Sequence, residues 1–321
     1  MRMILIILAI AAVVLGGLAV FTKLGVRRIE RAHPPAGRFV EVTGGRLHLV
    51  ELGPAGAPPV LLVHGASGNL NDMRVALGDR LAPRYRVILV DRPGHGWSDR
   101  PGGSADASPA RQAALIHQAL ERIGVSRAIV VGHSWSGALA TAYALAYPES
   151  VAGLVLLAPA THPSEESIGW YAPVLTTPVV GPLFARFVML PLGQFLVRPA
   201  VRAVFAPQPA PDNYVERAAV ELVLRPKEIT ANAEDLARLK AFVAIQAPHY
   251  GAIQAPTTII TGDIDNTVSH RIHAEVIAAM LPRGTLIVLP GIGHMPHHAA
   301  ADVAIKAIDE LASSRVSRPA D

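Results

Sequence analysis

Ser134 lies where a nucleophile is most clearly indicated in this sequence. The segment 132–137 (GHSWSG) follows an apolar run at 128–131 and precedes a helical pattern. A serine at such a strand-to-helix turn has strained backbone geometry and an exposed hydroxyl, and it requires small residues two positions away on both sides. Gly132 and Ser136 meet this requirement, although Gly is usual at the second position. Ser136 is a competing nucleophile, but the turn belongs immediately after the strand, which favours Ser134.

A serine hydroxyl is a weak nucleophile, so it needs a nearby base and an acid that orients this base. Asp265 and His294 are candidates for these roles because each follows the end of a predicted strand, at 257–261 and at 285–289. In doubly wound sheets, reactive groups gather at the carboxyl ends of the strands. The chain order Ser, Asp, His is also the order expected with a serine at such a turn.

Neighbouring residues compete for the same roles. Asp263 lies two positions before Asp265, and His297 and His298 follow His294. Only His294 comes directly after the glycine that ends its strand turn, whereas the other two histidines begin the next predicted helix. A metal site at these histidines would need a further ligand at helical spacing, and the pattern H-E-x-x-H is absent. We therefore expect neither a metal nor another cofactor.

The elements that must position these groups are indicated by apolar runs that alternate with helical patterns. Continuous runs without polar alternation are typical of strands buried on both faces of a parallel sheet. Two alternating runs around Gly44-Gly45 predict an antiparallel hairpin at one edge. We predict an α/β fold with a doubly wound, mostly parallel sheet of eight strands. The strand runs lie at 38–43, 46–51, 60–63, 87–90, 128–131, 151–157, 257–261 and 285–289.

A long segment interrupts this alternation and predicts a helical lid over the sheet, because a plain loop of such length is uncommon in a compact domain. Its apolar side chains either bind a hydrophobic substrate group or pack the lid on the core; they include Trp170, Tyr171, Phe184, Phe187, Met189 and Leu190. The predicted organisation is an anchor and spacer (1–37), a core in two parts (38–160 and 254–314), the lid (161–253) and a flexible tail (315–321).

Four motifs together resemble the α/β-hydrolase superfamily, in its branch of lidded esterases, C–C bond hydrolases and haloperoxidase-like enzymes. They are the serine turn, the segment 64–68 (HGASG), the Gly-rich loop 91–98 (DRPGHGWS), and the Gly-x-x-Asp and Gly-His pair, each after a predicted strand. The resemblance covers residues 38–311 and places the acid third after a glycine, at Asp265. It implies an oxyanion hole formed by the amide N–H groups of Ala66 and Trp135. The substrate contacts that we predict are His64, Gly65, Trp135 and Trp170.

The function that the resemblance implies is acyl transfer, with a small hydrophobic ester as substrate. A C–C bond hydrolase or a cofactor-free perhydrolase would use the same three groups, and no single residue separates these activities. Related dehalogenases have an Asp nucleophile followed by Trp, as Trp135 follows Ser134 here. Dehalogenases and epoxide hydrolases need that carboxylate, which disfavours both. A non-catalytic binding module would be expected to have lost one of the three groups.

The N-terminal segment is apolar enough to cross a membrane. Residues 3–22 carry no charge, and twenty residues span a hydrocarbon core of about 30 Å as a helix. The alternative is a cleaved signal peptide, but the run is longer than usual for one and lacks a convincing cleavage site. Four basic residues follow the run, which favours a cytoplasmic catalytic domain. They are Lys23, Arg27, Arg28 and Arg31.

Composition limits the remaining possibilities. The chain has 321 residues, of which 51% are hydrophobic and 17% charged, which suits one large domain with an insertion. Aromatic residues make up only 5%, which disfavours single-stranded nucleic acid as a partner. The net charge of +4 reflects the basic residues beside the apolar run. The absence of cysteine excludes disulfides, thiolate metal sites and a cysteine nucleophile.

Overall fold

The computed structural model describes residues 1–165, 169 and 171–313, and these residues form a sheet of eight strands. The spatial order is β1-β2-β4-β3-β5-β6-β7-β8. β2 pairs antiparallel with β1 and β4, and the other neighbours are parallel, which confirms the predicted α/β sheet. The strands are β1 (Arg38–Val42), β2 (Gly45–Leu52), β3 (Pro59–Val63), β4 (Arg86–Val90), β5 (Ala128–His133), β6 (Val151–Leu157), β7 (Thr257–Gly262) and β8 (Gly284–Leu289).

Both faces of the sheet are buried. In β3, Leu61 and Val63 join one apolar core, and Val60 and Leu62 join the other, because successive side chains of a strand point to opposite faces. The first face is covered by α4 (Pro109–Arg122), α5 (Ser136–Ala146) and α11 (Ala274–Met280). The second is covered by α2 (Leu70–Met73), the π-helical turn η1 (Arg74–Gly78), α3 (Asp79–Leu81) and α13 (Ala301–Ser313). The sheet is therefore doubly wound.

The β1–β2 hairpin differs from its prediction by one residue. Val42 pairs with Gly45, so the turn consists of Thr43 and Gly44 rather than of the two glycines. Gly44, the second turn residue, has a φ of +84°, a conformation that glycine adopts without strain.

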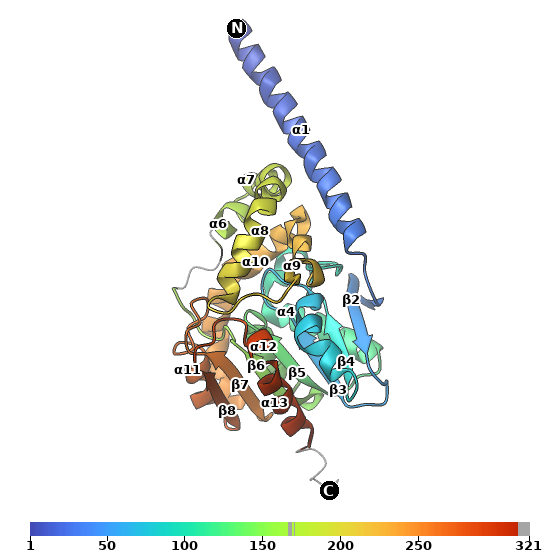
Figure 1. The fold of residues 1–321 in the computed structure, drawn as a ribbon, viewed down its shortest axis with the longest axis vertical. Helices are drawn as coiled ribbons and strands as arrows, with labels where there is room; N and C mark the ends of the chain where they lie inside the picture. Colours follow the sequence, from blue (N-terminus) through green and yellow to red (C-terminus); the bar gives the residue numbers. More distant parts are fainter. Residues whose placement is uncertain (166–168, 170, 314–321) are drawn as a thin grey trace.

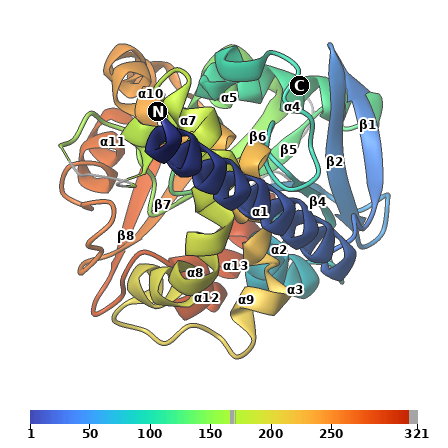
Figure 2. The ribbon, with the colours of Figure 1, turned by 90° about the horizontal axis from the view of Figure 1, so that it is seen from above.

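A helical insertion separates β6 from β7, in the range where the lid was predicted. Its last α-helix, α10, is also its longest, and the 3-10 helix η6 then returns the chain to the sheet. Figure 1 shows most of the insertion gathered at one end of the sheet, and Figure 2 looks onto that end. Its elements are α6 (Ala172–Leu175), α7 (Val180–Phe184), the π-helical η4 (Ala185–Met189), α8 (Leu190–Phe205), α9 (Tyr214–Arg217), η5 (Val220–Leu224), α10 (Pro226–Gln246) and η6 (Ala247–Ala252).

Helix α1 (Arg2–Ala32) projects from the end of the molecule at which the insertion lies (Figure 1). Most of its apolar side chains are exposed as far as Leu24, and its C-terminal part packs on the insertion, where Ile29 is buried in a core with α8 and η5. The helix stops at Ala32, just before the residue that precedes Pro34, as expected from the steric restriction that proline imposes on its predecessor. The predicted tail at 315–321 lies outside the described residues.

Candidate functional site

The sharp turn around Ser134 places its hydroxyl at the carboxyl end of β5. Ser134 has a φ of +53°, which is rare for a residue with a side chain. The turn is held because Ser134 N–H donates to Leu157 O at 2.9 Å, and Ser134 O accepts from the Gly137 N–H at 2.8 Å. A Cβ at Gly132 would lie 2.5 Å from Ser136 O, so the turn closes only with glycine at this position.

His294 and Asp265 complete a chain of hydrogen bonds that begins at Ser134. His294 Nε2 lies 2.9 Å from Ser134 Oγ, and His294 Nδ1 lies 2.7 Å from Asp265 Oδ2. The other Asp265 oxygen accepts the backbone N–H groups of Thr267, at 2.7 Å, and Val268, at 2.9 Å. With Nδ1–H donated to the carboxylate, Nε2 is free to accept the serine proton. The structure thus brings together the three residues that the sequence analysis selected.

The competing candidates lie elsewhere. Ser136 is fully buried and its hydroxyl donates to His64 O at 2.5 Å, so it is occupied in holding the turn to the loop after β3. Asp263 Oδ1 accepts the Gly291 N–H at 2.7 Å in an exposed turn. His297 and His298 contact another carboxylate, that of Asp72. Geometry therefore separates Ser134, Asp265 and His294 from their sequence neighbours.

Two backbone amides beside Ser134 have no acceptor among the described residues, namely the N–H groups of Ala66 and Trp135. Gly65 packs directly on the turn: a Cβ at this position would lie 3.1 Å from Ser134 Cβ and 2.9 Å from His133 Nδ1. The backbone after β3 therefore comes close to the serine only because residue 65 is glycine. Unbonded backbone amides close to a serine hydroxyl are what an oxyanion hole needs, so Ala66 and Trp135 stay the candidates for it.

The predicted substrate contacts through the His64 and Trp135 side chains are not supported. His64 is fully buried, its Nδ1 lies 2.8 Å from Gly65 O, and its Nε2 accepts the Arg92 N–H at 3.1 Å. Burial, with the Arg92 charge, lowers the pKa of His64 to about 3. The Trp135 indole is 1% exposed and donates to Asp235 O at 3.1 Å. Both rings organise the core instead, because their polar atoms are already bonded within it; Trp170 lies outside the described residues.

His133, next to the nucleophile candidate, links the serine turn to the His294 loop. Its Nε2–H donates to the backbone oxygen of His294 at 3.0 Å. Burial lowers the pKa of His133 well below its usual range, with further lowering by His297 and His294. A neutral His133 therefore fixes the backbone position of His294 without adding a charge to the site.

A buried ion pair that the sequence analysis did not identify joins the insertion to the core. Arg92, in the loop after β4, and Asp235, in α10, are both fully buried, and Arg92 Nη1 lies 2.6 Å from Asp235 Oδ2. Arg100 Nη2 donates to the other Asp235 oxygen at 3.0 Å, and Gln112 Nε2 also donates to this carboxylate. The Arg92 guanidinium stacks on Trp135 at 4.1 Å from the ring centroid. The motif at 91–98 indicated the loop that contains Arg92, but no motif indicated its partner Asp235.

A second contact of α10 fixes the loop next to the candidate oxyanion hole. Asn232 is fully buried, and its Oδ1 accepts the Ser67 N–H at 2.6 Å. Its Nδ2 donates to Ser67 Oγ at 3.0 Å and to Tyr171 Oη at 2.8 Å. Helix α10 thus holds the loop 64–68 through the hydrogen bonds of Asn232, and it holds the loop after β4 through the ion pair of Asp235 with Arg92.

Among the described residues, one group of side chains is arranged as metal ligands often are. It consists of Asp72, His297 and His298. Asp72 Oδ2 lies 3.1 Å from His297 Nε2, and Oδ1 lies 2.8 Å from His298 Nε2 and accepts the Tyr214 O–H at 2.8 Å. A metal-bound histidine donates its other ring N–H to an acceptor, yet buried His297 Nδ1 has no partner among the described residues. Hydrogen bonding of the two imidazoles to the carboxylate fits this arrangement better than a metal does.

The electrostatics of this cluster support a hydrogen-bonded carboxylate. Burial acts to raise the pKa of Asp72, but the neighbouring His297 and His298 outweigh it and hold this pKa well below its usual range. Burial lowers the pKa of His297. Tyr214 belongs to the insertion, so Asp72 connects α2, the insertion and the segment after His294.

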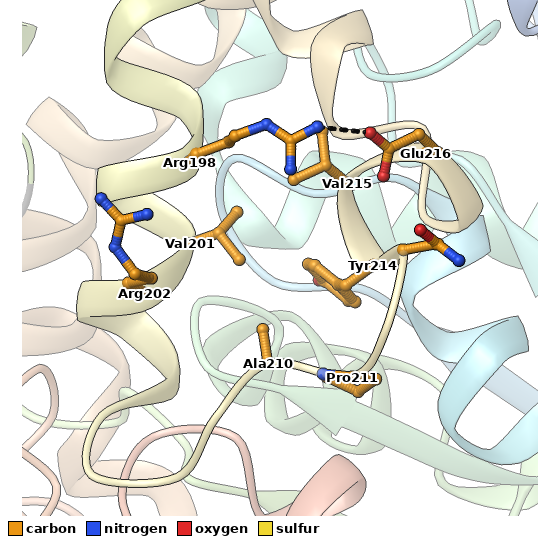
Figure 3. Close-up of a pocket in the computed structure, with 9 residues that line it drawn as sticks. Arg198, Val201, Arg202, Ala210, Pro211, Tyr214, Val215 and Glu216 are labelled. Atoms are coloured by element: carbon orange, nitrogen blue, oxygen red, sulfur yellow. Dashed lines mark hydrogen bonds and ion pairs between the residues drawn. The ribbon is translucent and has the colours of Figure 1, made fainter.

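A surface hollow of about 150 Å³ lies on the insertion between α8 and α9 (Figure 3). The ion pair of Arg198 with Glu216, with 2.7 Å between Nη2 and Oε1, crosses it. None of its lining residues belongs to the group of Ser134, Asp265 and His294. This hollow is therefore separate from the candidate active site.

The chain belongs to the α/β-hydrolase family, because the family model described as "alpha/beta hydrolase fold" matches residues 58–301. Lipase 1 of Psychrobacter immobilis is 27% identical over 290 residues, which cover 85% of this chain and 80% of that protein. Epoxide hydrolase 4 of Mus musculus is 32% identical over 142 residues, which cover 41% of this chain and 39% of that protein. Hydrolases of more than one kind are thus among its relatives.

Solved structures share the fold. A membrane phospholipase A, described as a bacterial virulence factor, superposes with a TM-score of 0.70 at 23% identity and covers 98% of both chains. The meta-cleavage product hydrolase of Pseudomonas fluorescens IP01 superposes with a TM-score of 0.67 at 22% identity, covering 87% of this chain and 98% of that one. These likenesses identify a common architecture.

Proposed function

We propose that this protein is a membrane-anchored serine hydrolase that cleaves carboxylic esters with a hydrophobic acyl or alcohol group. The observation that carries the proposal is the continuous hydrogen-bonded chain from Ser134 Oγ through His294 to Asp265, at 2.9 Å and 2.7 Å. The strained φ of Ser134 supports it, because backbone strain is retained where the surrounding structure enforces it and often marks a functional site.

In the proposed reaction, His294 Nε2 takes the proton of Ser134 as Oγ attacks the ester carbonyl carbon. The amides of Ala66 and Trp135 stabilise the negative charge on the carbonyl oxygen. The tetrahedral intermediate collapses, and the leaving alcohol takes the proton from His294. Water then attacks the acyl-enzyme with His294 again as base, which releases the acid and restores the serine. Asp265 holds the imidazole tautomer and supports its positive charge.

Ser134 itself weighs against two activities found in this fold. Epoxide hydrolysis and dehalogenation through an alkyl-enzyme ester need a carboxylate nucleophile, and the turn after β5 carries a hydroxyl. The likeness to an epoxide hydrolase covers less than half of either chain. Ester hydrolysis is therefore preferred, and the related lipase covers most of the chain.

The membrane part of the proposal rests on α1. The helix is long and apolar enough to span a bilayer, and its described apolar window is unburied. Gly25 and Ile29 pack on the insertion, which supports retention of this segment in the mature protein rather than its removal as a signal peptide. The basic residues after the apolar run favour a catalytic domain on the cytoplasmic side.

The test is turnover of p-nitrophenyl esters of increasing acyl length by the full chain in detergent. We expect the parent to turn over these esters and to prefer longer acyl groups. Turnover should be lost in Ser134→Ala and retained in Ser136→Ala. Ser136→Ala is the matched control because it removes a neighbouring hydroxyl that is bonded to His64 O. Undiminished turnover in Ser134→Ala would contradict the nucleophile, and a preference for acetate would contradict the hydrophobic substrate.

A further inference from the structure

Five apolar side chains of the insertion are exposed on α7, on the residue before it and on the first turns of α8. They form what we name the apolar lid surface: Val179 (74% exposed), Val180 (50%), Leu183 (52%), Phe195 (80%) and Leu196 (37%). Leu183 and Phe195 are separated by about 18 Å along the continuous helical segment Val180–Phe205, so the apolar lid surface is elongated. Exposed apolar side chains along a helix mark a surface that contacts another apolar phase or a partner. The candidate active site does not use these residues.

This surface lies beside the point where the apolar run of α1 ends. Helix α1 contacts η4 and α8, and Figure 1 shows α7 at the end from which α1 projects, with α8 running from there toward the sheet. The contact is a close one: a Cβ at Gly25 would lie 2.7 Å from Leu190 Cδ2, at the first residue of α8. Gly25 comes three residues after the uncharged run 3–22, a rise of about 5 Å along a helix. The insertion is therefore held at the level where α1 leaves the hydrocarbon.

The surrounding charges match a lipid headgroup layer. Lys23, Arg27 and Arg28 on α1 are exposed, and so is Arg186 on η4. Basic side chains beside an apolar surface are attracted to anionic headgroups. An apolar helix surface accompanied by exposed basic residues is typical of a segment that lies in the membrane interface.

The segment Val180–Phe205 is long and apolar enough to cross a membrane, but its packing indicates that it lies on the surface. A third of its apolar window (33%) is buried inside the protein, where Leu190 and Phe205 join the core of the insertion. Arg198 on this segment pairs with Glu216 of α9 at 2.7 Å. One face is therefore held by protein, and only the opposite face is free to meet lipid.

We propose that the apolar lid surface inserts into the membrane interface next to α1, so that the protein contacts the bilayer through its insertion as well as through its anchor. The proposal rests on the membrane anchor proposed above. Its partner is a lipid surface. Because the insertion also contacts the loops around Ser134 through Asn232 and Asp235, an ester dissolved in the bilayer would meet the insertion without first entering water.

The absence of cysteine allows a direct test on the full chain. Val180→Cys, Leu183→Cys and Phe195→Cys are each labelled with an environment-sensitive fluorophore and reconstituted into phosphatidylcholine and phosphatidylglycerol vesicles with or without doxyl-labelled lipid. Leu8→Cys, within the apolar run, is the control for insertion of the anchor. Ile245→Cys on α10 is the matched control for an exposed apolar position, since Ile245 is 75% exposed.

We expect doxyl lipid to quench the three lid positions and position 8, but not position 245. Quenching at position 8 without quenching at the lid positions would overturn the proposal, and a fluorescence blue shift at the lid without quenching would assign this surface to a second copy of the chain. Absence of quenching at position 8 would overturn both the anchor and this inference.

A functional readout separates this inference from the proposed activity. In Leu183→Asp with Phe195→Asp, we expect hydrolysis of an ester lipid embedded in vesicles to fall by about tenfold or more, because two anchoring side chains are lost. Turnover of a water-soluble p-nitrophenyl ester should stay at the parent level. Equal losses on both substrates would contradict a membrane role of the apolar lid surface. A parent inactive on both substrates would contradict the proposed function, and the quenching result would then still decide whether this surface contacts lipid.

Discussion

The φ of +53° at Ser134 places a cost of about 1–3 kcal/mol on the turn, and its neighbours hold the turn in place. Glycine at positions 65 and 132 lets the backbone approach on both sides. Ser136 contributes a hydrogen bond to His64 O, which explains why a serine is accommodated where glycine is usual. The geometry of the hydroxyl is therefore determined by residues that need not react.

Asp265→Asn tests the role of the acid. The amide would favour the wrong tautomer of His294, so we expect kcat for ester hydrolysis to fall by about 10³- to 10⁴-fold with little change in KM. Asp263→Asn is the matched control, because Asp263 only accepts the Gly291 N–H in an exposed turn. Similar losses in both variants, measured by steady-state kinetics, would contradict the assignment of Asp265.

Residue identity and chain order were enough to select Ser134, Asp265 and His294, because each follows a strand end that apolar runs reveal. Their catalytic roles stay a prediction. The directions of the His64 and Trp135 side chains could not be foreseen, since they depend on Arg92 and Asp235. The ion pair of Arg92 with Asp235 joins residues 143 positions apart, and it exists only when the insertion is packed on the core.

At the scale of elements, α10 is the part of the insertion that holds the loops of the candidate site. Its Asp235 neutralises the buried Arg92, and its Asn232 bonds Ser67 beside the candidate oxyanion hole. Burial lowers the pKa of Arg92, and Asp235 opposes this effect. The charged pair is thus a fixed connection between insertion and core rather than a surface contact.

Asp235→Asn should destabilise the fold strongly, because it leaves the buried Arg92 charge without its carboxylate. We expect a loss of about 3–5 kcal/mol in the free energy of unfolding, measured by urea denaturation in detergent. Glu234→Gln is the control: Glu234 also pairs with Arg100, at 3.0 Å, but is partly exposed, so its loss should stay below about 1 kcal/mol. Comparable losses of unfolding free energy in the two variants would show that the buried ion pair contributes no more to stability than the partly exposed one.

Apolar runs predicted the strands well because strands buried on both faces have no polar positions to obscure them. The hairpin turn was misplaced by one residue, since two adjacent glycines suit a turn equally well and only the pairing of Val42 with Gly45 decides between them. The docking of α1 on the insertion could not be predicted, because it depends on how Gly25 meets Leu190.

At the scale of the whole molecule, buried titratable groups make stability depend on pH. Burial is the first cause of a lowered pKa at His64 (to about 3), His95, His133, His162 (to about 4) and His297. Because each folded pKa lies below the usual 6.5, the unfolded chain binds more protons as the pH falls below that value. Stability is therefore lost on acidification, by about 2 kcal/mol at pH 5 for one fully buried histidine.

Glu228 acts in the opposite direction. Burial raises its pKa from 4.5 to about 7, although Arg225 opposes this effect. Its stabilising contribution to the free energy of unfolding is therefore fully present below pH 4.5 and is lost as the pH rises through 7. One carboxyl does not offset several histidines, so we expect the free energy of unfolding to decrease from pH 7 to pH 5. Glu228→Gln should make this decrease steeper. A parent whose stability rises over this range would contradict the buried neutral histidines.

The most direct measurement for the central claim is labelling by a fluorophosphonate, followed by mass spectrometry of the modified peptide. The full chain, Ser134→Ala and Ser136→Ala are compared in the same detergent. The proposed nucleophile predicts one adduct on Ser134 in the parent, the same adduct in Ser136→Ala and none in Ser134→Ala. An adduct on Ser136, or a folded parent that does not react, would contradict the account of a serine activated by His294.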